Sequence, residues 1–301
     1  MTKDNLNWVV LGPGAIGGLI AGGLLEQSQT VSLLPRHTAP RELNWRVIRS
    51  DATRDYRATA VQLPLPANSI FIVAVKAFDV IDALQRISEL DGFRKSMPIV
   101  LSHNGMVVLP KSLQTLNLHH MVTTHGAVKS QDENGGICIE HRGVGRSWLE
   151  VAKTPQIPLY GSILQHAFPP MHFENDLTER RWLKLVINSV INPLTAINQC
   201  PNGELLEQKW QSQIYRLVEE AVSLAKQKKI PLTVEGCYQE VIRVAQETAL
   251  NHSSMLQDVE QHRRTEIQQL TGYLISAGES EGIATPTHQA LLNEFQKRYT
   301  F

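Results

Sequence analysis

The chain has 301 residues, 42% hydrophobic and 19% charged, which is enough for two globular domains with proper cores. Its 29 basic residues balance 29 acidic ones, so no overall field favours nucleic acid or an anionic membrane surface. The three cysteines, Cys138, Cys200 and Cys237, are widely spaced, which disfavours a zinc or dithiol site and fits a reducing, cytoplasmic compartment.

Residues 8–25 carry no charge, but they do not resemble an export signal or a membrane span. Six of them are glycine and one is proline, and no basic segment precedes them. The pattern favours a buried strand, a glycine turn and a buried helix.

The first half alternates short apolar runs with helical stretches. Continuous apolar runs are typical of parallel strands covered by helices on both faces. Glycines and β-forming residues at 119–128 and 135–151 predict antiparallel strands added to that sheet. We therefore expect an α/β fold whose first domain, residues 1–175, is a Rossmann-like doubly wound sheet. The apolar runs predicted as strands are 7–12, 30–36, 69–76 and 97–105, and the predicted helix is 16–27.

Beyond about residue 175 the pattern becomes helical, which predicts an all-helical domain over residues 176–301. Thr285 precedes Pro286, so we expect its hydroxyl to cap the last helix. The predicted helices are 179–192, 210–229, 235–250, 263–282 and 286–299.

A G-x-G-x-x-G motif follows the first predicted strand and opens the first helix. Gly12 permits a tight turn, Gly14 lets the main chain approach a pyrophosphate, and Gly17 lets the helix pack closely on the strand. The alternative, a glycine-rich packing turn without a ligand, is less consistent with this position in the chain. The motif predicts a dinucleotide site at the helix N-terminus.

The end of the second strand carries no acidic residue of the kind that holds the ribose in NAD enzymes. Arg36 lies there instead, and a guanidinium suits the 2′-phosphate of NADP. A surface arginine could fall at this position by chance, but we expect NADP in preference to NAD.

A lysine and two asparagines recur every fourth residue in the apolar segment "KLVINSVINP". Lys184, Asn188 and Asn192 therefore share one helix face, while Leu185 and Val190 lie on others. Asparagine is a poor helix former, so a helix face that merely contacts solvent would more naturally carry other polar residues. The row therefore lines a site or, less readily, forms a solvent-exposed strip. Because proline disfavours helical geometry in the residue before it, we expect the helix to end or bend at Asn192.

Other polar groups are ambiguous when taken singly. Lys76 and Asn104 follow apolar runs and should emerge at the carboxyl edge of the sheet, where doubly wound folds bind ligands, although ordinary turn chemistry explains them nearly as well. Asn251, Ser254 and Glu266 are equally consistent with caps or solvated positions. No metal-ligand cluster and no nucleophile elbow is present in the sequence, so metal hydrolysis and serine or cysteine catalysis are unsupported.

The motifs "GPGAIGG", "VKAFDV", "HNGM", "KLVINSVINPLTAINQCPNGELL" and "SSMLQDVEQHRRTEI" together resemble the ketopantoate reductase (2-dehydropantoate 2-reductase) family. The resemblance spans nearly the whole chain. It implies a two-domain enzyme that uses NADPH to reduce 2-dehydropantoate to (R)-pantoate in pantothenate synthesis. A monomer and a homodimer are both open, and the charge balance predicts no nucleic-acid or membrane partner.

The resemblance also implies roles for individual residues. Lys184 matches the general acid, with the protonated ammonium of an ordinary lysine (pKa near 10.4) stabilising and protonating the alkoxide. Glu266 matches an acid that assists catalysis and contacts substrate and cofactor. Substrate binding is implied for Asn104, Asn188, Asn192, Asn251 and Ser254, and cofactor binding for Gly12, Gly14, Ala15, Ile16, Gly17, Arg36, Lys76, Asn104 and Glu266. Pro13 departs from the family turn, because proline removes one amide N–H from it.

Two other functions fit the same residues. The scaffold could reduce another small branched 2-keto acid, because the acid and the anchoring groups would act on related carbonyls. A non-catalytic NADPH-binding regulator is a second alternative, against which Lys184 and Glu266 argue.

The sequence generates one prediction about cofactor choice. Arg36→Ala should weaken NADPH binding by on the order of 1.5–3 kcal/mol, because a charge-assisted contact to the 2′-phosphate is lost. The affinity for NADH should change little. Fluorescence titration with both cofactors measures the two effects, and equal weakening of both would make Arg36 a structural residue.

Overall fold

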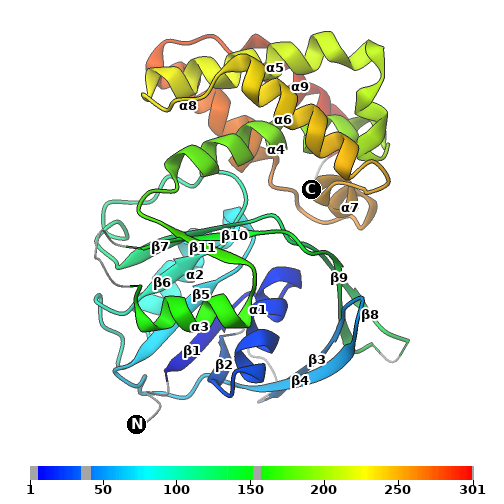
Figure 1. Cartoon of the computed structure of the whole chain (residues 1–301). Coiled ribbons are helices and arrows are strands. Elements are labelled where there is room, and N and C mark those ends of the chain that lie inside the picture. Colours follow the sequence, from blue (N-terminus) through cyan, green and yellow to red (C-terminus); the bar gives the residue numbers. More distant parts are fainter. Residues whose placement is uncertain (1–5, 35–41, 134, 152–156, 300–301) are drawn as a thin grey trace. The chain divides into compact units, whose positions relative to one another are not determined.

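The computed structural model describes residues 6–34, 42–133, 135–151 and 157–299, which form two compact units (Figure 1). Unit 1 comprises Met1–His103 and Val108–Leu177, and unit 2 comprises Asn104–Val107 and Thr178–Phe301. The main change from one unit to the other falls after Leu177. The short segment Asn104–Val107, although it follows a strand of unit 1, packs with unit 2, which no sequence pattern indicated.

The centre of unit 1 is a parallel sheet with its first strand in the middle. The strand order β7-β6-β5-β1-β2-β4 is parallel throughout and is typical of a doubly wound fold, so the expected fold class is confirmed. The bounds are β1 Asn7–Leu11, β2 Thr30–Leu34, β4 Thr53–Ala60, β5 Ser69–Val73, β6 Ile99–Leu101 and β7 Leu118–Thr123.

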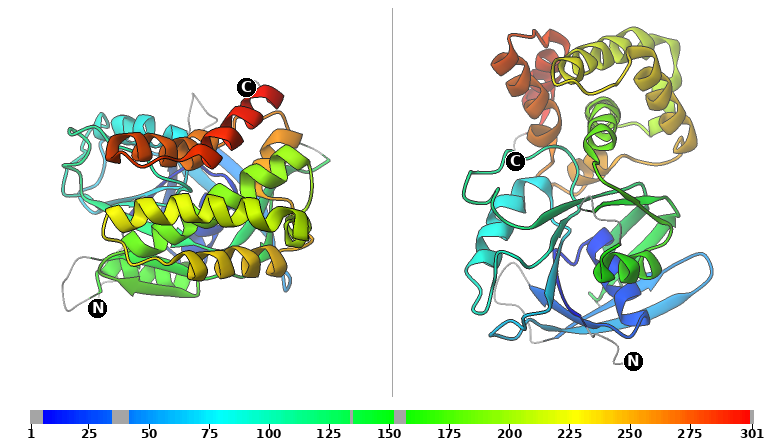
Figure 2. Two further views of the ribbon diagram at one scale, coloured as in Figure 1. Left: turned by 90° about the horizontal axis from the view of Figure 1, so that it is seen from above. Right: turned by 60° about the vertical axis from the view of Figure 1, so that its left-hand side comes forward.

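Helices cover both faces of this sheet, which is why its strands are apolar throughout. Every residue of β5 is buried, as are four of the five residues of β1. Figure 2 (right) shows α2 on one side of the sheet and α1 and α3 on the other. The helix bounds are α1 Ala15–Glu26, the 3₁₀ turn η1 Ala77–Asp79, α2 Val80–Ser88 and α3 Leu159–Ala167.

Further strands extend the sheet at both ends. Strands β3 (Glu42–Ile48), β8 (Gly126–Gln131) and β9 (Ile137–Gly143) continue it beyond β4, while β10 (Ser147–Glu150) and β11 (Met171–Glu174) continue it beyond β7. The pairs β8–β9 and β7–β10 are antiparallel, as expected. The prediction was wrong in detail for β7 and β9, which run parallel to β6 and β3 respectively.

In unit 2 a long helix, α4 (Thr178–Asn198), packs against four others. The helix does not end at Asn192 as predicted, because Pro193 lies inside it among buried residues such as Ile191 and Leu194. Tertiary packing of these side chains outweighs the local cost of proline. The other elements are η2 Asn202–Leu206, α5 Gln208–Gln227, α6 Val234–Glu247, α7 Ser254–Glu260, the π-helical turn η3 Gln268–Gly272, α8 Tyr273–Glu281 and α9 Pro286–Arg298.

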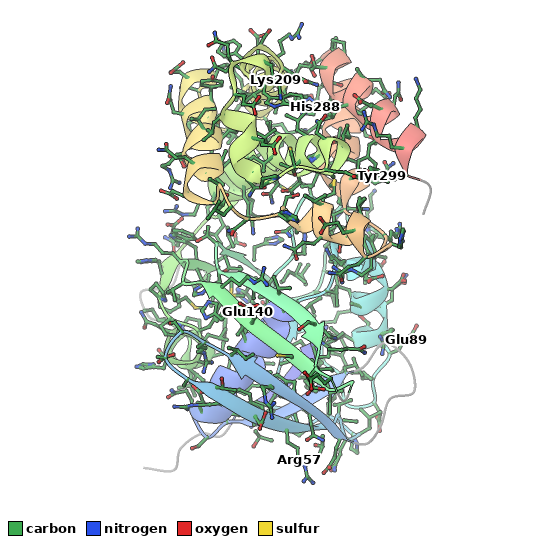
Figure 3. The ribbon with its side chains drawn as sticks, turned by 90° about the vertical axis from the view of Figure 1, so that its right-hand side faces the viewer. Arg57, Glu89, Glu140, Lys209, His288 and Tyr299 are labelled. Atoms are coloured by element: carbon green, nitrogen blue, oxygen red, sulfur yellow. The ribbon has the colours of Figure 1, made fainter. Side chains whose placement is uncertain are left out.

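The start of α9 is capped by a carboxylate from another helix. The helix begins at Pro286, as expected, but the Thr285 side chain makes no capping hydrogen bond. Glu220 of α5 instead accepts the backbone N–H groups of Thr287 and His288 and the Nδ1–H of His288, at 2.7, 3.0 and 2.9 Å. The His288 side chain, labelled in Figure 3, is fully buried. Burial alone would raise the pKa of Glu220, but these hydrogen bonds outweigh it and lower the pKa to about 2.

This cap should make the stability of the protein dependent on acid pH. Because the pKa of Glu220 is about 2 in the folded state against 4.5 ordinarily, its contribution is complete above about pH 4.5 and is lost as the pH falls towards 2. Glu220→Gln should therefore lower the free energy of unfolding near neutral pH by on the order of 2–3 kcal/mol and flatten its decline in acid.

Urea unfolding at several pH values measures this effect. Glu219→Gln, an exposed neighbour on the same helix, is the matched control and should behave like the parent protein. An unchanged acid decline in the Glu220→Gln variant would show that the cap has no such role.

Candidate functional site

The glycine turn of unit 1 has the geometry of an anion-binding loop. Gly12 has φ of +75°, and a Cβ at Gly17 would lie 2.1 Å from the carbonyl oxygen of Gly12, so both positions require glycine. A Cβ at Gly14 would meet nothing closer than 3.9 Å, so the turn leaves open space in front of it. The residues present therefore fit a pyrophosphate seated on the turn.

Helix α1 starts at Ala15 with Gly14 as its N-cap, and neither a capping side chain nor an acidic residue occupies its first turn. The amides of Ala15, Ile16 and Gly17 belong to this first turn, whose N–H groups have no intrahelical acceptor. A helix N-terminus of this kind favours an anionic ligand.

Two lysines lie near this edge of the sheet. Strands β1 and β5 end in register at Leu11 and Val73, so Lys76, which precedes η1, emerges at the same carboxyl edge as Gly12. Lys129 of β8 donates from Nζ to the carbonyl oxygen of Pro13 at 3.4 Å. No sequence pattern indicated Lys129, because the strand pairing that brings β8 to the turn is non-local. Arg36 lies outside the described residues.

In unit 2 the predicted polar row is present on α4. Lys184 and Asn188 are half-buried and Asn192 is buried, so the row runs from a partly open to a closed environment. Burial lowers the pKa of Lys184 to about 8, and the carboxylate of Glu266 opposes this shift. The sequence-based assumption of an ordinary lysine pKa was wrong, because a semi-buried ammonium loses hydration.

Glu266 lies at the centre of this part of unit 2. It is only 5% exposed, and the Asn104 side chain donates from Nδ2 to its Oε2 at 3.3 Å, although the two residues are 162 positions apart. Together with the electrostatic coupling of Glu266 to Lys184, this hydrogen bond brings three of the predicted site residues into one cluster.

Asn251 and Ser254 are exposed, and the described contacts do not link them to this cluster. The helix cap is the preceding residue, Ser253, which accepts the N–H of Leu256 at 3.1 Å and the hydroxyl of Thr195 at 2.7 Å. Ser253 thus joins α7 to α4, and Ser254 follows as the first residue of α7.

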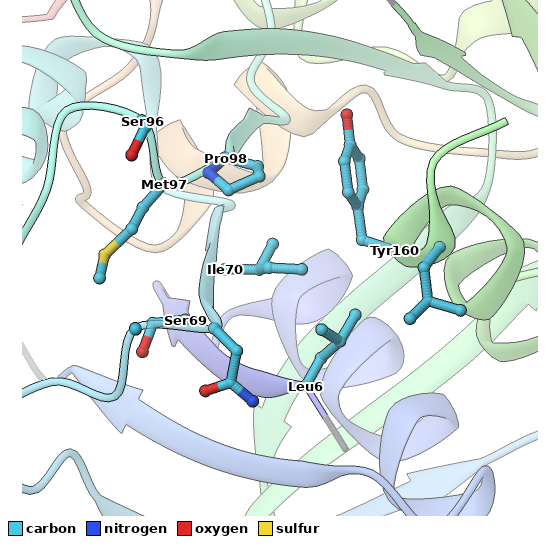
Figure 4. Close-up of a pocket in the computed structure, with 10 residues that line it drawn as sticks. Leu6, Ser69, Ile70, Ser96, Met97, Pro98 and Tyr160 are labelled. Atoms are coloured by element: carbon cyan, nitrogen blue, oxygen red, sulfur yellow. The ribbon is translucent and has the colours of Figure 1, made fainter. Parts of the chain in front are cut away.

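A small hollow of about 210 Å³ lies at the opposite edge of the unit 1 sheet (Figure 4). It is lined by Leu6, Ser69 and Pro98, which precede or start strands, and by Tyr160 of α3. Ligands of doubly wound folds bind at the carboxyl ends of strands, so this amino-edge hollow is separate from the glycine turn.

Within the described ranges, no group of three histidine, cysteine or acidic residues could hold a metal ion. Among the same residues, no helix is long and apolar enough to cross a membrane.

Comparisons with known proteins agree along the whole chain. A family model described as "Ketopantoate reductase PanE/ApbA" matches residues 8–153, and its C-terminal counterpart matches residues 176–298. A 2-dehydropantoate 2-reductase of Vibrio cholerae is 32% identical and covers 97% of both chains.

Among solved structures, a 2-dehydropantoate 2-reductase of Geobacter metallireducens is similar with a TM-score of 0.83 at 20% identity, over 98% of this chain and 100% of that one. A D-mandelate dehydrogenase solved with NADH and anilino(oxo)acetate has a TM-score of 0.79 at 20% identity, over 97% and 98% of the two chains. At these identities the structures share the fold.

The environment of Lys184 generates a prediction that needs neither cofactor nor substrate. An NMR titration of ¹³C-labelled lysine, assigned with a Lys184→Met spectrum, should give a midpoint near pH 8 for Lys184. Glu266→Gln should move the midpoint lower, because the negative charge that favours the ammonium is gone. A midpoint above 10, or one that Glu266→Gln raises, would contradict the described electrostatics.

Proposed function

Because the chain belongs to the ketopantoate reductase family of oxidoreductases, we propose that it reduces 2-dehydropantoate to (R)-pantoate with NADPH, using Lys184 as the general acid. Membership implies a nicotinamide cofactor and a small-molecule substrate, as the sequence resemblance led us to expect. The observation that carries the proposal is the cluster of Lys184, Glu266 and Asn104 in unit 2, since it contains the proton donor that a ketone reduction requires.

The cofactor, when bound, supplies the hydride that the ketone carbon accepts. Reduction leaves negative charge on the former carbonyl oxygen, and the ammonium of Lys184 stabilises that charge and then transfers its proton to the oxygen. A pKa of about 8 suits this role, since the lysine is mostly protonated near pH 7 and yet gives up its proton more readily than an ordinary lysine. The buried carboxylate of Glu266 keeps the ammonium form favoured.

The remaining polar groups of unit 2 would hold the substrate. We assign Asn188 and Asn192 to its carboxylate or hydroxyl, because they continue the face of α4 that carries Lys184. Asn104 would contact substrate and nicotinamide, with its amide held on Glu266. Asn251 and Ser254, near the start of α7, would contribute from the exposed side.

In unit 1, the amides of Ala15, Ile16 and Gly17 would hold the pyrophosphate at the glycine turn, with Lys76 at the same sheet edge. Pro13 contributes no N–H to this turn. Lys129, whose ammonium lies against the Pro13 carbonyl, would add positive charge beside the phosphates. Arg36 would select NADPH through its 2′-phosphate.

The fold similarity to D-mandelate dehydrogenase supports a second candidate, reduction of another branched 2-keto acid on the same scaffold. Steady-state kinetics over a panel of 2-keto acids separates the two candidates. A specificity constant for another acid more than tenfold above that for ketopantoate would favour the second.

Lys184→Ala should reduce the turnover of ketopantoate by roughly 10²–10⁴-fold, the usual contribution of a positioned proton donor, and leave NADPH binding intact. Glu266→Ala and Asn192→Ala should act more on KM, because they hold the ground state as well as the transition state. NADPH consumption, followed by its near-ultraviolet absorbance, measures both effects.

Lys226→Ala, an exposed lysine of α5, is the control and should keep the parent rate. If a folded Lys184→Ala protein reduces ketopantoate within threefold of the parent rate, Lys184 is not the general acid.

A further inference from the structure

The segment Asn104–Val107 docks onto the π-helical turn η3 through the main chain. The buried Met106 donates its N–H to the carbonyl oxygen of Gln269 at 2.9 Å. Gly105, with φ of +69°, passes so close that a Cβ there would lie 2.4 Å from the same oxygen. One carbonyl of the turn therefore fixes the segment, and only glycine fits beside it.

The turn that provides this carbonyl begins at the candidate active site. The carbonyl of Glu266 accepts the N–H groups of both Gln269 and Leu270, at 3.0 and 3.1 Å, at the point where the π-helical turn starts. π-Helical turns are rare in proteins, and those that do occur are often found at functional sites. Gln269 follows Glu266 by three residues and Met106 follows Asn104 by two, so the main-chain contact lies directly beside the Asn104–Glu266 hydrogen bond.

We propose that the turn η3 positions Asn104 for the reacting substrate. The close contact of Gly105 with the Gln269 carbonyl holds the side-chain amide of Asn104 on Glu266. The inference rests on the proposed function, since Asn104 acts there as a substrate contact. An isolated 3.3 Å side-chain bond between distant residues would have to oppose the entropy of ordering both. The main-chain contact orders the segment beforehand and leaves Asn104 preorganised.

Two glycines with the same backbone conformation provide a matched test. Gly105→Ala and Gly282→Ala both place a Cβ at φ of +69°, but a Cβ at Gly282 meets nothing within 4 Å. Both variants should lose some thermal stability through backbone strain. Gly105→Ala alone should lower kcat/KM for ketopantoate, by on the order of 10–100-fold, because it displaces Asn104. Equal kinetics in the two variants would overturn the proposal.

A double variant distinguishes positioning from general damage. If Gly105 acts through Asn104, then Gly105→Ala should add nothing further to the kinetic defect of Asn104→Ala. Independent, multiplying losses would mean that Gly105 serves the fold rather than Asn104, and the proposal would fail.

Amide hydrogen exchange on the parent protein supplies a measurement that does not depend on variants or substrate. The Met106 amide should exchange at least about 100-fold more slowly than in an unstructured peptide, because it is buried and bonded to Gln269. Exchange at the peptide rate would overturn the docking even if Gly105→Ala failed to fold. Slow exchange in a protein that does not reduce ketopantoate would instead reject the proposed function and leave the docking intact.

Discussion

The proposed chemistry of unit 2 depends on one constraint, the burial of Lys184 beside the buried carboxylate of Glu266. Removing Lys184 from water favours its neutral form, and the carboxylate of Glu266 opposes this effect without cancelling it. A buried carboxylate must itself be hydrogen-bonded, and Asn104 supplies such a bond. The position of Asn104 depends on Gly105, which has a positive φ, and on the π-helical turn η3.

The proposed reduction uses groups from each unit. Unit 1 has a glycine turn with open space that fits a phosphate and a helix start without acidic residues. Unit 2 has a lysine with a lowered pKa, the proposed proton donor, and a row of asparagine amides. The helical unit also contains a largely buried carboxylate outside the candidate site, that of Glu220, which caps α9.

Local sequence patterns predicted those parts of the fold and of the site that depend on residues close together in the sequence. The strand, glycine turn and helix around Gly12 follow from composition and spacing, and the face shared by Lys184 and Asn188 follows from helical periodicity. The hairpin of β3 and β4 was missed, because the exposed face of β4 carries charged residues such as Asp55 and Arg57 and few positions of the strand are buried. Its stability comes from pairing with distant strands.

Non-local causes explain the other differences. Helix α4 continues through Pro193 because the packing of buried neighbours outweighs the local preference of proline. At the start of α9 the cap is the carboxylate of Glu220 from another helix and not the Thr285 hydroxyl. The lowered pKa of Lys184 depends on burial, which a linear sequence does not specify. The approach of Asn104 to Glu266 was suggested only by resemblance, since no pattern joins residues so far apart.

The pH dependence of kcat/KM for ketopantoate tests the central claim most directly. If Lys184 is the proton donor with a pKa of about 8, the parent rate constant should fall as the pH rises through about 8, with the fall beginning at lower pH in Glu266→Gln. A kcat/KM that stays constant from pH 7 to 10 in the parent protein would contradict the account. So would a fall that occurs at the same pH in Glu266→Gln as in the parent protein.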